Sequence, residues 1–400
     1  REPLDWKNPD FYDKDAIEKE MERVFDVCHT CRRCVSLCDS FPTLFDLIDE
    51  SETFEIDGVD KADFGKVVDQ CFLCDLCAET KCPYVPPHEW AIDFPHLMLR
   101  AKAQKFAAKD TKWRDRIITS TDSIFEAIST PGVAQVTNAA ADSKAMRKVG
   151  EKVLGLHRDA PLPKFLPKAL RKSLPDEIGS DRIARPTEKT SGKVAIYVTC
   201  YGDHNEPQMV EDLISVLQHN EIPVKILQDA RCCGMPKLEH GDIDGVAKNA
   251  KRVAAAFRPY IEKGYDVVAL TPSCSLMLKF EWPLILPGDE EIELLSKATR
   301  DISEYIVDIA KNEGLADGMK PLDGGVTVHL ACHARAQNMG QKAAELMKLV
   351  PETKLHVVER CSGHGGSWGI KKEFFEVGMK VGKPIFRQAL NKGQAKYVAS

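Results

Sequence analysis

The sequence predicts an α+β protein of several domains, with a mostly helical N-terminal domain followed by two consecutive α/β units whose strands are parallel. Three observations predict this fold class. The first quarter of the chain carries cysteine-rich loops between helical segments. From residue 192, buried strand-like runs alternate with helical ones, which is typical of parallel sheets. The same alternation begins again at residue 326, with cysteines at corresponding places.

Composition limits the classes of function. The chain has 400 residues, of which 43% are apolar and 29% charged, as in ordinary soluble globular proteins of two or three domains. No run approaches the roughly 18 apolar residues of a membrane span. The net charge of −6 and the lack of a zinc finger or basic-aromatic motif argue against nucleic acid as a partner. No secretory leader opens the chain, so we expect a cytoplasmic protein, and a start at Arg1 suggests that the natural start lies upstream.

The N-terminal domain is expected to span residues 12–108. Residues 13–27 have apolar side chains at helical spacing and lead directly into the first cysteines. Residues 86–108 have a similar pattern, which three prolines interrupt. Between these segments lie two runs of four cysteines, namely Cys28, Cys31, Cys34 and Cys38, then Cys71, Cys74, Cys77 and Cys82.

The spacing of these cysteines predicts two [4Fe–4S] clusters in a ferredoxin-like domain. Each iron of a cubane takes one thiolate, and in two-cluster ferredoxins the fourth cysteine of each run ligates the other cluster. The expected ligand sets are therefore Cys28, Cys31, Cys34 and Cys82 for cluster 1, and Cys71, Cys74, Cys77 and Cys38 for cluster 2.

Two features test this interpretation. Four residues separate Cys77 from Cys82, one more than in the usual run, so the backbone there should bulge. A structural zinc site is the alternative, but zinc usually takes two pairs of cysteines, and a triple would leave one ligand unused. A disulfide framework is also disfavoured, because the cysteines crowd into short loops of a long chain.

Residues 109–190 are expected to form a basic helical linker. Residues 101–190 carry 18 Lys and Arg against 11 Asp and Glu. The segment could simply pack against the neighbouring domains. Alternatively, basic residues interleaved with apolar ones could lie peripherally on the anionic inner face of the cytoplasmic membrane.

The first α/β unit is expected at residues 191–315. Strands are predicted at 193–200, 224–228 and 266–274, and helices at 206–219, 242–262 and 290–313. Cofactors on parallel sheets bind at the carboxyl ends of strands, which is where the cysteines of this unit fall. A third iron–sulfur cluster is therefore predicted, with structural zinc or inert thiols as alternatives; its ligands would be Cys200, Cys232, Cys233 and Cys274.

The second unit, residues 322–400, has fewer ligands. Strands are predicted at 326–332, 354–359 and 396–400, with helices at 339–349 and 370–390. Cys332 and Cys361 align with Cys200 and Cys232, but Ser362 replaces the second cysteine of the pair, so a cluster here stays an open question. His333 and His364 are the other candidate ligands. The counterpart of Cys274 would fall just after residue 400, so we expect the natural chain to continue.

Paired strand-Cys and Cys-Cys-Gly units behind a two-cluster ferredoxin domain resemble the CCG-domain iron–sulfur proteins. That family includes iron–sulfur subunits of glycolate oxidase and of heterodisulfide reductase, and the resemblance is strongest to those of anaerobic glycerol-3-phosphate dehydrogenases. It extends to Ser129-Thr-Pro131, Leu162-Pro-Lys164 and the run from Gly365 to Glu373.

The resemblance implies an electron-transfer subunit without a catalytic site of its own, working between a flavin-dependent dehydrogenase partner and a quinone or other acceptor. No Gly-x-Gly-x-x-Gly follows a strand, so a flavin would have to come from the partner. One alternative is a thiol–disulfide reductase that uses the Cys232-Cys233 cluster, although neither unit has the five cysteines of disulfide-cleaving relatives. Another is a redox partner of a diiron peroxide-reducing protein.

Overall fold

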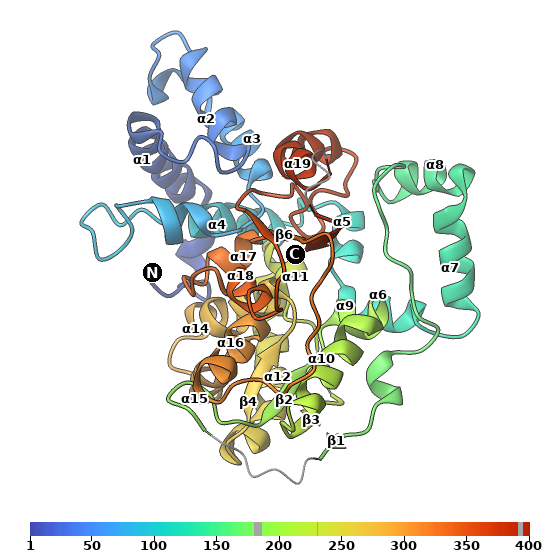
Figure 1. Ribbon diagram of the computed structural model, residues 1–400. Helices are drawn as coiled ribbons and strands as arrows, with labels where there is room; N and C mark the ends of the chain where they lie inside the picture. The colour runs from blue at the N-terminus through green and yellow to red at the C-terminus, as the bar shows by residue number, and fades with distance from the viewer. Residues whose placement is uncertain (180–185, 230, 391–394) are drawn as a thin grey trace.

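The protein is represented by a computed structural model that describes residues 1–179, 186–229, 231–390 and 395–400 (Figure 1). The N-terminal helices lie at one end of the molecule and the larger sheet lies toward the other, while helices α7 and α8 project from the side (Figure 1). Helices combine with two sheets of largely parallel strands, which confirms the predicted α+β class. Among the described helices, none has both the length and the hydrophobicity that crossing a bilayer requires.

The N-terminal region is mostly helical. Helix α1 begins after Asp13, whose side chain accepts a hydrogen bond from the Ala16 N–H. It continues past the predicted end at residue 27 and stops where Arg32 takes a left-handed conformation, with φ of 49°. The helix predicted from residue 86 begins only at Phe94, after the proline-rich stretch. The elements are η1 (Pro9–Tyr12), α1 (Lys14–Cys31), α2 (Ser40–Asp49), η2 (Ile56–Gly58), η3 (Lys61–Asp63), α3 (Phe64–Gln70), η4 (Cys77–Lys81) and α4 (Phe94–Ala107).

The basic middle segment contains four short helices and then an extended stretch. Residues 180–185 of the predicted linker lie outside the described residues. The elements are α5 (Trp113–Ile118), α6 (Thr121–Ile128), α7 (Val133–Asp142), α8 (Lys144–Val153), η5 (Leu170–Ser173) and β1 (Glu177–Ile178).

The first sheet has the order β1-β3-β2-β4-β5, and only β1 pairs antiparallel. The single helix predicted over 290–313 is wrong. It is split by strand β5, and Asp301 at the end of that strand caps α16 together with Glu304. The elements are β2 (Val194–Tyr197), α9 (Cys200–His204), α10 (Pro207–His219), β3 (Val224–Ile226), α11 (Met235–Leu238), α12 (Ile243–Glu262), β4 (Asp266–Ala269), α13 (Pro272–Leu276), η6 (Met277–Glu281), α14 (Trp282–Ile285), α15 (Glu290–Ala298), β5 (Thr299–Asp301) and α16 (Ile302–Asn312).

The second sheet has three parallel strands in the order β7-β6-β8. Its central strand β6 comes first in the sequence, just as β2 lies between β3 and β4 in the first sheet. The elements are β6 (Val326–His329), α17 (Cys332–Arg335), α18 (Lys342–Met347), β7 (Leu355–Val358), α19 (Phe375–Leu390) and β8 (Tyr397–Ala399).

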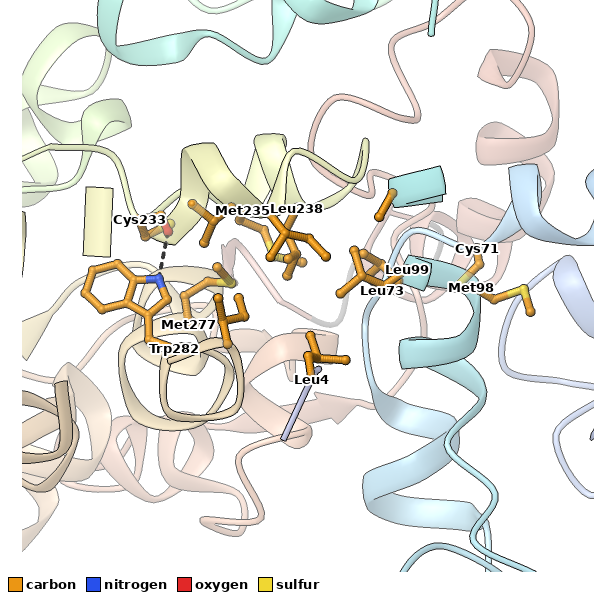
Figure 2. Packing of buried hydrophobic residues seen from close by; sticks show 14 of the residues in the cluster. Leu4, Cys71, Leu73, Met98, Leu99, Cys233, Met235, Leu238, Met277 and Trp282 are labelled. Atoms are coloured by element: carbon orange, nitrogen blue, oxygen red, sulfur yellow. Dashed lines mark hydrogen bonds between the residues drawn. The ribbon is translucent and has the colours of Figure 1, made fainter. Parts of the chain in front are cut away.

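One hydrophobic core joins the N-terminal region to the first sheet unit. It runs through α1, α2 and α4 and continues into α11, α12 and η6. Figure 2 shows Leu73 and Leu99 from the N-terminal region on one side and Met277 and Trp282 on the other, with Leu4 between them. Alternate residues of β2 serve different cores, as the two-residue period of a strand requires: Tyr197 faces this core, whereas residues 194 and 196 face a second one under α10 and α16.

Candidate metal centres

The first cavity lies at the end of α1. Four cysteines line it together with Phe41 and Tyr84. Two of the cysteines, Cys28 and Cys31, lie three residues apart on the last turn of α1, so they share one face of the helix. The three-residue spacing of these two cysteines was expected in a loop, but in the structure it lies on a helix. The four lining cysteines are Cys28, Cys31, Cys34 and Cys82.

A π-helical turn brings Cys82 to this cavity. Residues Cys77–Lys81 form the turn, and the Cys82 N–H donates to the Cys77 carbonyl at 2.8 Å. A π-helical turn accommodates an additional residue within a helix. The extra residue between the two cysteines is thus absorbed as a local bulge, which agrees with the sequence-based expectation.

The second cavity lies beside the first and shares Phe41 with it. Apolar side chains such as Phe72 and Phe94 complete its wall. Leu73 and Asp75 have positive φ values of 52° and 60°, so the cysteine loop curls tightly around the cavity. The four lining cysteines are Cys38, Cys71, Cys74 and Cys77.

Electrostatics link the thiols of the two cavities. Burial raises the pKa of Cys34 to about 12, and the neighbouring Cys82 and Cys31 contribute to that rise. Burial likewise raises the pKa of Cys77, and both Cys74 of its own cavity and Cys34 of the other cavity contribute. Crowded thiols with raised pKa values are costly to ionise without a cation, and bound iron would relieve that cost.

A third group of thiols lies at the carboxyl ends of the first sheet. Cys200 follows β2, the pair Cys232-Cys233 follows β3, and Cys274 follows β4, so three adjacent parallel strands deliver them to one edge. The sulfur atoms of Cys200 and Cys232 are 3.8 Å apart. Gly234 has a φ of 85°, and its N–H donates to the Cys232 sulfur at 3.4 Å.

The surroundings hold the Cys232-Cys233 turn in place. The Cys232 N–H donates to the Asp122 carboxylate at 2.6 Å, and Asn249 bridges that carboxylate and the Cys232 carbonyl at 2.7 and 3.1 Å. The Trp282 indole donates to the Cys233 carbonyl at 3.1 Å (Figure 2). Asp122 could not be identified from the sequence, because nothing local to the 109–190 segment marks a residue that supports a loop 110 positions away.

A hydrogen bond runs from the Cys200 thiol to the Cys232 sulfur. Hydrogen bonds from the thiols of Cys200 and Cys233 lower the pKa of Cys232, and the Gly234 N–H adds to that effect. The same contact with Cys232, together with burial, raises the pKa of Cys200. Of the two thiols, Cys232 therefore loses its proton more readily, and thiolates are the form that binds metals.

The two cysteines of the second sheet lie beside the second cavity. Cys332 follows β6 and Cys361 follows β7, and the Cys361 sulfur accepts a hydrogen bond from the Gly363 N–H at 3.3 Å. The pKa of Cys74 is raised, mainly by burial. The neighbouring thiol of Cys332 adds to the rise, and that of Cys361 also contributes. The His333 ring nitrogen Nε2 donates to the carbonyl of Leu73, in the loop of the second cavity, at 3.3 Å. His333 is therefore occupied with the backbone.

The glycine-rich loop after Cys361 packs against the same cavity loop. A Cβ atom on Gly365 would lie 2.9 Å from the Phe72 ring, and one on Gly366 would collide with Glu239. The Trp368 indole donates to the Asp69 carbonyl at 2.9 Å. Glycines allow the backbone of this loop to approach its neighbours closely, because the loop lies between the N-terminal region and the first sheet unit.

Comparison with known proteins identifies the family. The CCG family profile, which describes a cysteine-rich domain, matches residues 194–279 and 326–400. Lactate utilization protein A of Bacillus pumilus is 30% identical over 187 residues, which cover 45% of this chain and 75% of that protein. The chain belongs to the CCG cysteine-rich domain family.

Two other relatives match longer stretches of this CCG protein. One subunit of the anaerobic glycerol-3-phosphate dehydrogenase of Escherichia coli is 28% identical over 304 residues, which cover 74% of this chain and 72% of the relative. One subunit of the fumarate reductase (CoM/CoB) of Methanothermobacter marburgensis is 25% identical over 228 residues, or 56% and 41% of the two chains. No solved structure matches the CCG protein.

The donor sets of the CCG protein fit iron–sulfur clusters. Soft thiolates select such clusters or zinc, and two cavities each offer four thiolates spread over a wall. Within the described residues, no three His, Cys, Asp or Glu side chains converge as ligands of a single metal ion.

Proposed function

We propose that this protein is an iron–sulfur electron-transfer subunit of an oxidoreductase, relaying electrons between a flavoprotein dehydrogenase and a quinone or another redox acceptor. The observation that carries the proposal is the pair of adjacent cavities, each lined by four cysteines. A single structural metal site would have no need of a second thiolate set next to it. Iron–sulfur clusters, when bound, supply one-electron carriers.

The proposed ligand sets follow the cavities. Cluster 1 takes the thiolates of the first cavity and cluster 2 those of the second. A third cluster takes the four cysteines at the edge of the first sheet. Cys77 is influenced by thiols of both cavities, so the first two clusters would be direct neighbours. Cys74 is influenced by Cys332 and Cys361, so the second sheet unit would lie beside cluster 2.

The partner is inferred from the relatives. Their names describe subunits of a glycerol-3-phosphate dehydrogenase and of a fumarate reductase. The chain contains no dinucleotide-binding glycine motif after a strand. Substrate chemistry is therefore assigned to a flavin-containing partner, and this chain is assigned the transfer of electrons.

Metal analysis tests the central proposal. The protein should be purified without oxygen and examined by iron determination and electron paramagnetic resonance. Two interacting signals of ferredoxin type are expected from clusters 1 and 2, and Cys71→Ser should remove one of them. Iron amounting to less than one cluster per chain, or zinc in its place, would refute the proposal.

We further propose that the α7–α8 hairpin contacts an anionic membrane surface at the cytoplasmic face. Met146, Val149 and Val153 form a row along α8, and each is about half exposed. Lys148 and Lys152 lie beside that row. An apolar row flanked by lysines suits the boundary between headgroups and acyl chains of anionic lipid.

Vesicle sedimentation tests this contact. Binding is expected to phosphatidylglycerol vesicles, to weaken with salt, and to be lost in the triple variant Lys144→Glu, Lys148→Glu and Lys152→Glu. The matched control exchanges Lys14, Lys19 and Lys66 for Glu and should still bind. Equal binding of both triple variants would remove the hairpin from the proposal while leaving electron transfer intact.

The thiol–disulfide reductase alternative has one supporting observation, the stabilised thiolate of Cys232. Cys232 is buried, however, and Trp282 and Asp122 close over its turn. A reduced-dye assay with disulfide substrates decides the matter. Unchanged turnover in Cys233→Ser would eliminate this activity.

A further inference from the structure

Glu239 is a buried carboxyl group that the electron path described so far does not use. It follows α11 directly, and only 4% of its surface is exposed. Its Oε2 accepts hydrogen bonds from the Ser367 N–H at 3.2 Å and from the Ser367 hydroxyl at 3.0 Å. Its Oε1 is also buried, and no described residue donates to it. Leaving a charged oxygen in this position is costly, whereas a protonated Oε1 avoids the cost of burying a charge.

Four elements pack around this carboxyl group and supply charges. Lys102 comes from α4 and His240 follows Glu239 itself. Asp115 comes from α5, and Lys371 follows the glycine-rich loop. The Lys371 ammonium lies 3.1 Å from the Asp115 carboxylate and 2.7 Å from the His240 ring, so it is largely occupied by those two groups.

Lys102 connects Glu239 to cluster 2. Its ammonium donates a hydrogen bond to the carbonyl oxygen of Cys71, a proposed ligand of that cluster. Lys102 and Glu239 act on one another electrostatically, and Asp69 of α3 also acts on Lys102. The Lys102 side chain therefore links Glu239 to the backbone of the loop that lines the second cavity.

The balance of these charges lets Glu239 change its protonation near neutral pH. Burial raises the pKa of Glu239 to about 7, although the Ser367 hydrogen bonds and Lys102 oppose that rise. Burial and the two lysines Lys371 and Lys102 lower the pKa of His240 to about 2, so that ring stays neutral. Glu239 is thus a group of this cluster of side chains whose charge can switch in the neutral range.

We propose that Glu239 is a proton-binding site coupled to the redox state of cluster 2. This inference rests on the proposed electron-transfer function. With the cluster bound, Glu239 would take up one proton from water as one electron arrives from the flavoprotein donor, and would become a neutral acid. The carboxyl group would release that proton when the electron leaves for the acceptor. The reduced cluster carries one more negative charge, which favours the neutral acid over the carboxylate and offsets the added charge.

The arrangement of the glycine-rich loop supports this role. A Cβ atom on Gly366 would collide with the Glu239 carboxyl group in its present position, and one on Gly365 would lie 2.9 Å from the Phe72 ring of the cluster 2 loop. The glycine-rich loop thereby packs against both the Glu239 carboxyl group, which is buried, and the loop of the second cavity. A water-poor setting strengthens the coupling between the two charges.

A redox titration of the intact, cluster-loaded protein tests the proposal. The cluster 2 signal should be followed by electron paramagnetic resonance at several pH values, from mildly acidic to mildly alkaline. In the unaltered protein the reduction potential should fall as pH rises, because reduction takes up a proton. In Glu239→Gln the potential should be independent of pH. The matched control Glu262→Gln changes an exposed glutamate of α12 and should retain the pH dependence.

Two further results keep the test decisive. Ser367→Ala removes a hydroxyl that favours the carboxylate, so the pH range of the effect should move upward. An equal pH dependence in Glu239→Gln and the unaltered protein would overturn the proposal, as would a potential that is independent of pH in the unaltered protein. Loss of both cluster signals from the unaltered protein would instead reject electron transfer itself. If Glu239→Gln fails to load clusters, Ser367→Ala decides, and an unmoved pH range refutes the coupling.

Discussion

The two CCG units place a cysteine at the same point of the same strand order, yet they face different surroundings. Cys232 and Cys361 both follow the second strand of their unit, β3 and β7. Each accepts a hydrogen bond from the glycine two residues later, at 3.4 and 3.3 Å. In the first unit three more cysteines and Trp282 surround this turn. In the second unit the turn lies beside Cys74 of the N-terminal region.

The two units share the backbone geometry of this turn but differ in the number of cysteines around it. The Cys-x-Gly turn forms its N–H to sulfur hydrogen bond whether the middle residue is Cys233 or Ser362, because the glycine and not the side chain provides the conformation. The first unit encloses its own thiols, whereas the second brings its thiols to a centre that the N-terminal region builds. We therefore expect equivalent changes in the two units to have unequal effects.

The largest difference is expected from removing the corresponding cysteines. Cys232→Ala should abolish the third cluster, because it deletes the thiolate of the Cys200 and Cys232 pair. Cys361→Ala should retain the iron of all three proposed clusters. Iron determination and electron paramagnetic resonance on the two variants measure this. Equal iron loss in both would show that the second unit holds a cluster of its own.

The next effect concerns the tryptophan that packs beside the cysteine turn of each unit, Trp282 in the first and Trp368 in the second. Trp282 is completely buried, so Trp282→Ala should lower the free energy of unfolding by about 3–5 kcal/mol. Trp368 packs on Phe72 and Phe374 in a loop that can partly collapse, so Trp368→Ala should cost less. Denaturant unfolding of both variants measures the two values. A larger loss in Trp368→Ala would contradict the view that the first unit belongs to the main core.

The molecule has two buried contacts, here called joints, that should respond to different pH ranges. His96 links the N-terminal region to the first unit, and Glu239 links the first unit to the loop after Cys361. His96 contacts Asp93 and Glu281 at the joint with the first unit. Burial alone would lower the pKa of His96, but these two carboxylates raise it to about 9. Its stabilisation is therefore complete below about pH 6.5, the usual histidine value, and is lost as pH rises through about 9. Glu239 has a pKa of about 7, so its contribution is complete below about 4.3 and is lost as pH rises through about 7.

Hydrogen exchange measures this difference, which amounts to about 3–4 kcal/mol at each joint. Raising the pH from about 4.5 to about 6.5 should reduce protection in the loop after Cys361, while α13 and α14 keep theirs and lose it between about pH 6.5 and about 9. Glu239→Gln should remove the early change and His96→Gln the late one. Simultaneous loss of protection at both joints would contradict the assignment.

The smallest expected effect comes from Asp122, which belongs to the basic segment and supports the first unit only. Asp122→Ala leaves the Cys232 N–H and the Asn249 amide without their acceptor, which should cost about 1–2 kcal/mol. The control Asp110→Ala removes an exposed carboxyl group and should be nearly neutral. Thermal unfolding distinguishes them, and equal midpoints would mean that the turn does not depend on this acceptor.

Sequence reasoning was most successful where the information is local. The presence of parallel strands follows from buried runs that alternate with helices, and every predicted strand of both units is present. The strands predicted to end at Cys200, Cys274 and Cys332 are shorter, because each of these cysteines lies in a short helix after the strand. The grouping of Cys82 with the first cysteine run depended on a general rule for two-cluster chains. The cavities bring together the same sets of residues, although the ligand assignment itself stays a prediction.

Long-range contacts could not be predicted. Strand β5 was missed because residues 299–301 are short and continue a helical pattern on either side. Nothing in the spacing of Cys332 and Cys361 indicates that they pack beside Cys74. The glycines at 365 and 366 were interpretable only when the neighbours Phe72 and Glu239 were known. Such contacts depend on how finished units dock, and a single sequence records that only indirectly.

The continuous core in Figure 2 has a consequence for anyone who would dissect this molecule. A fragment ending after α4 would expose Leu73 and Leu99 to water, and a fragment beginning at β2 would do the same to Leu238. Neither piece would be an independent module, and both would be prone to aggregation during expression. Insertions and tags are better placed in the projecting α7–α8 hairpin, where the polypeptide can be lengthened without disturbing any cysteine.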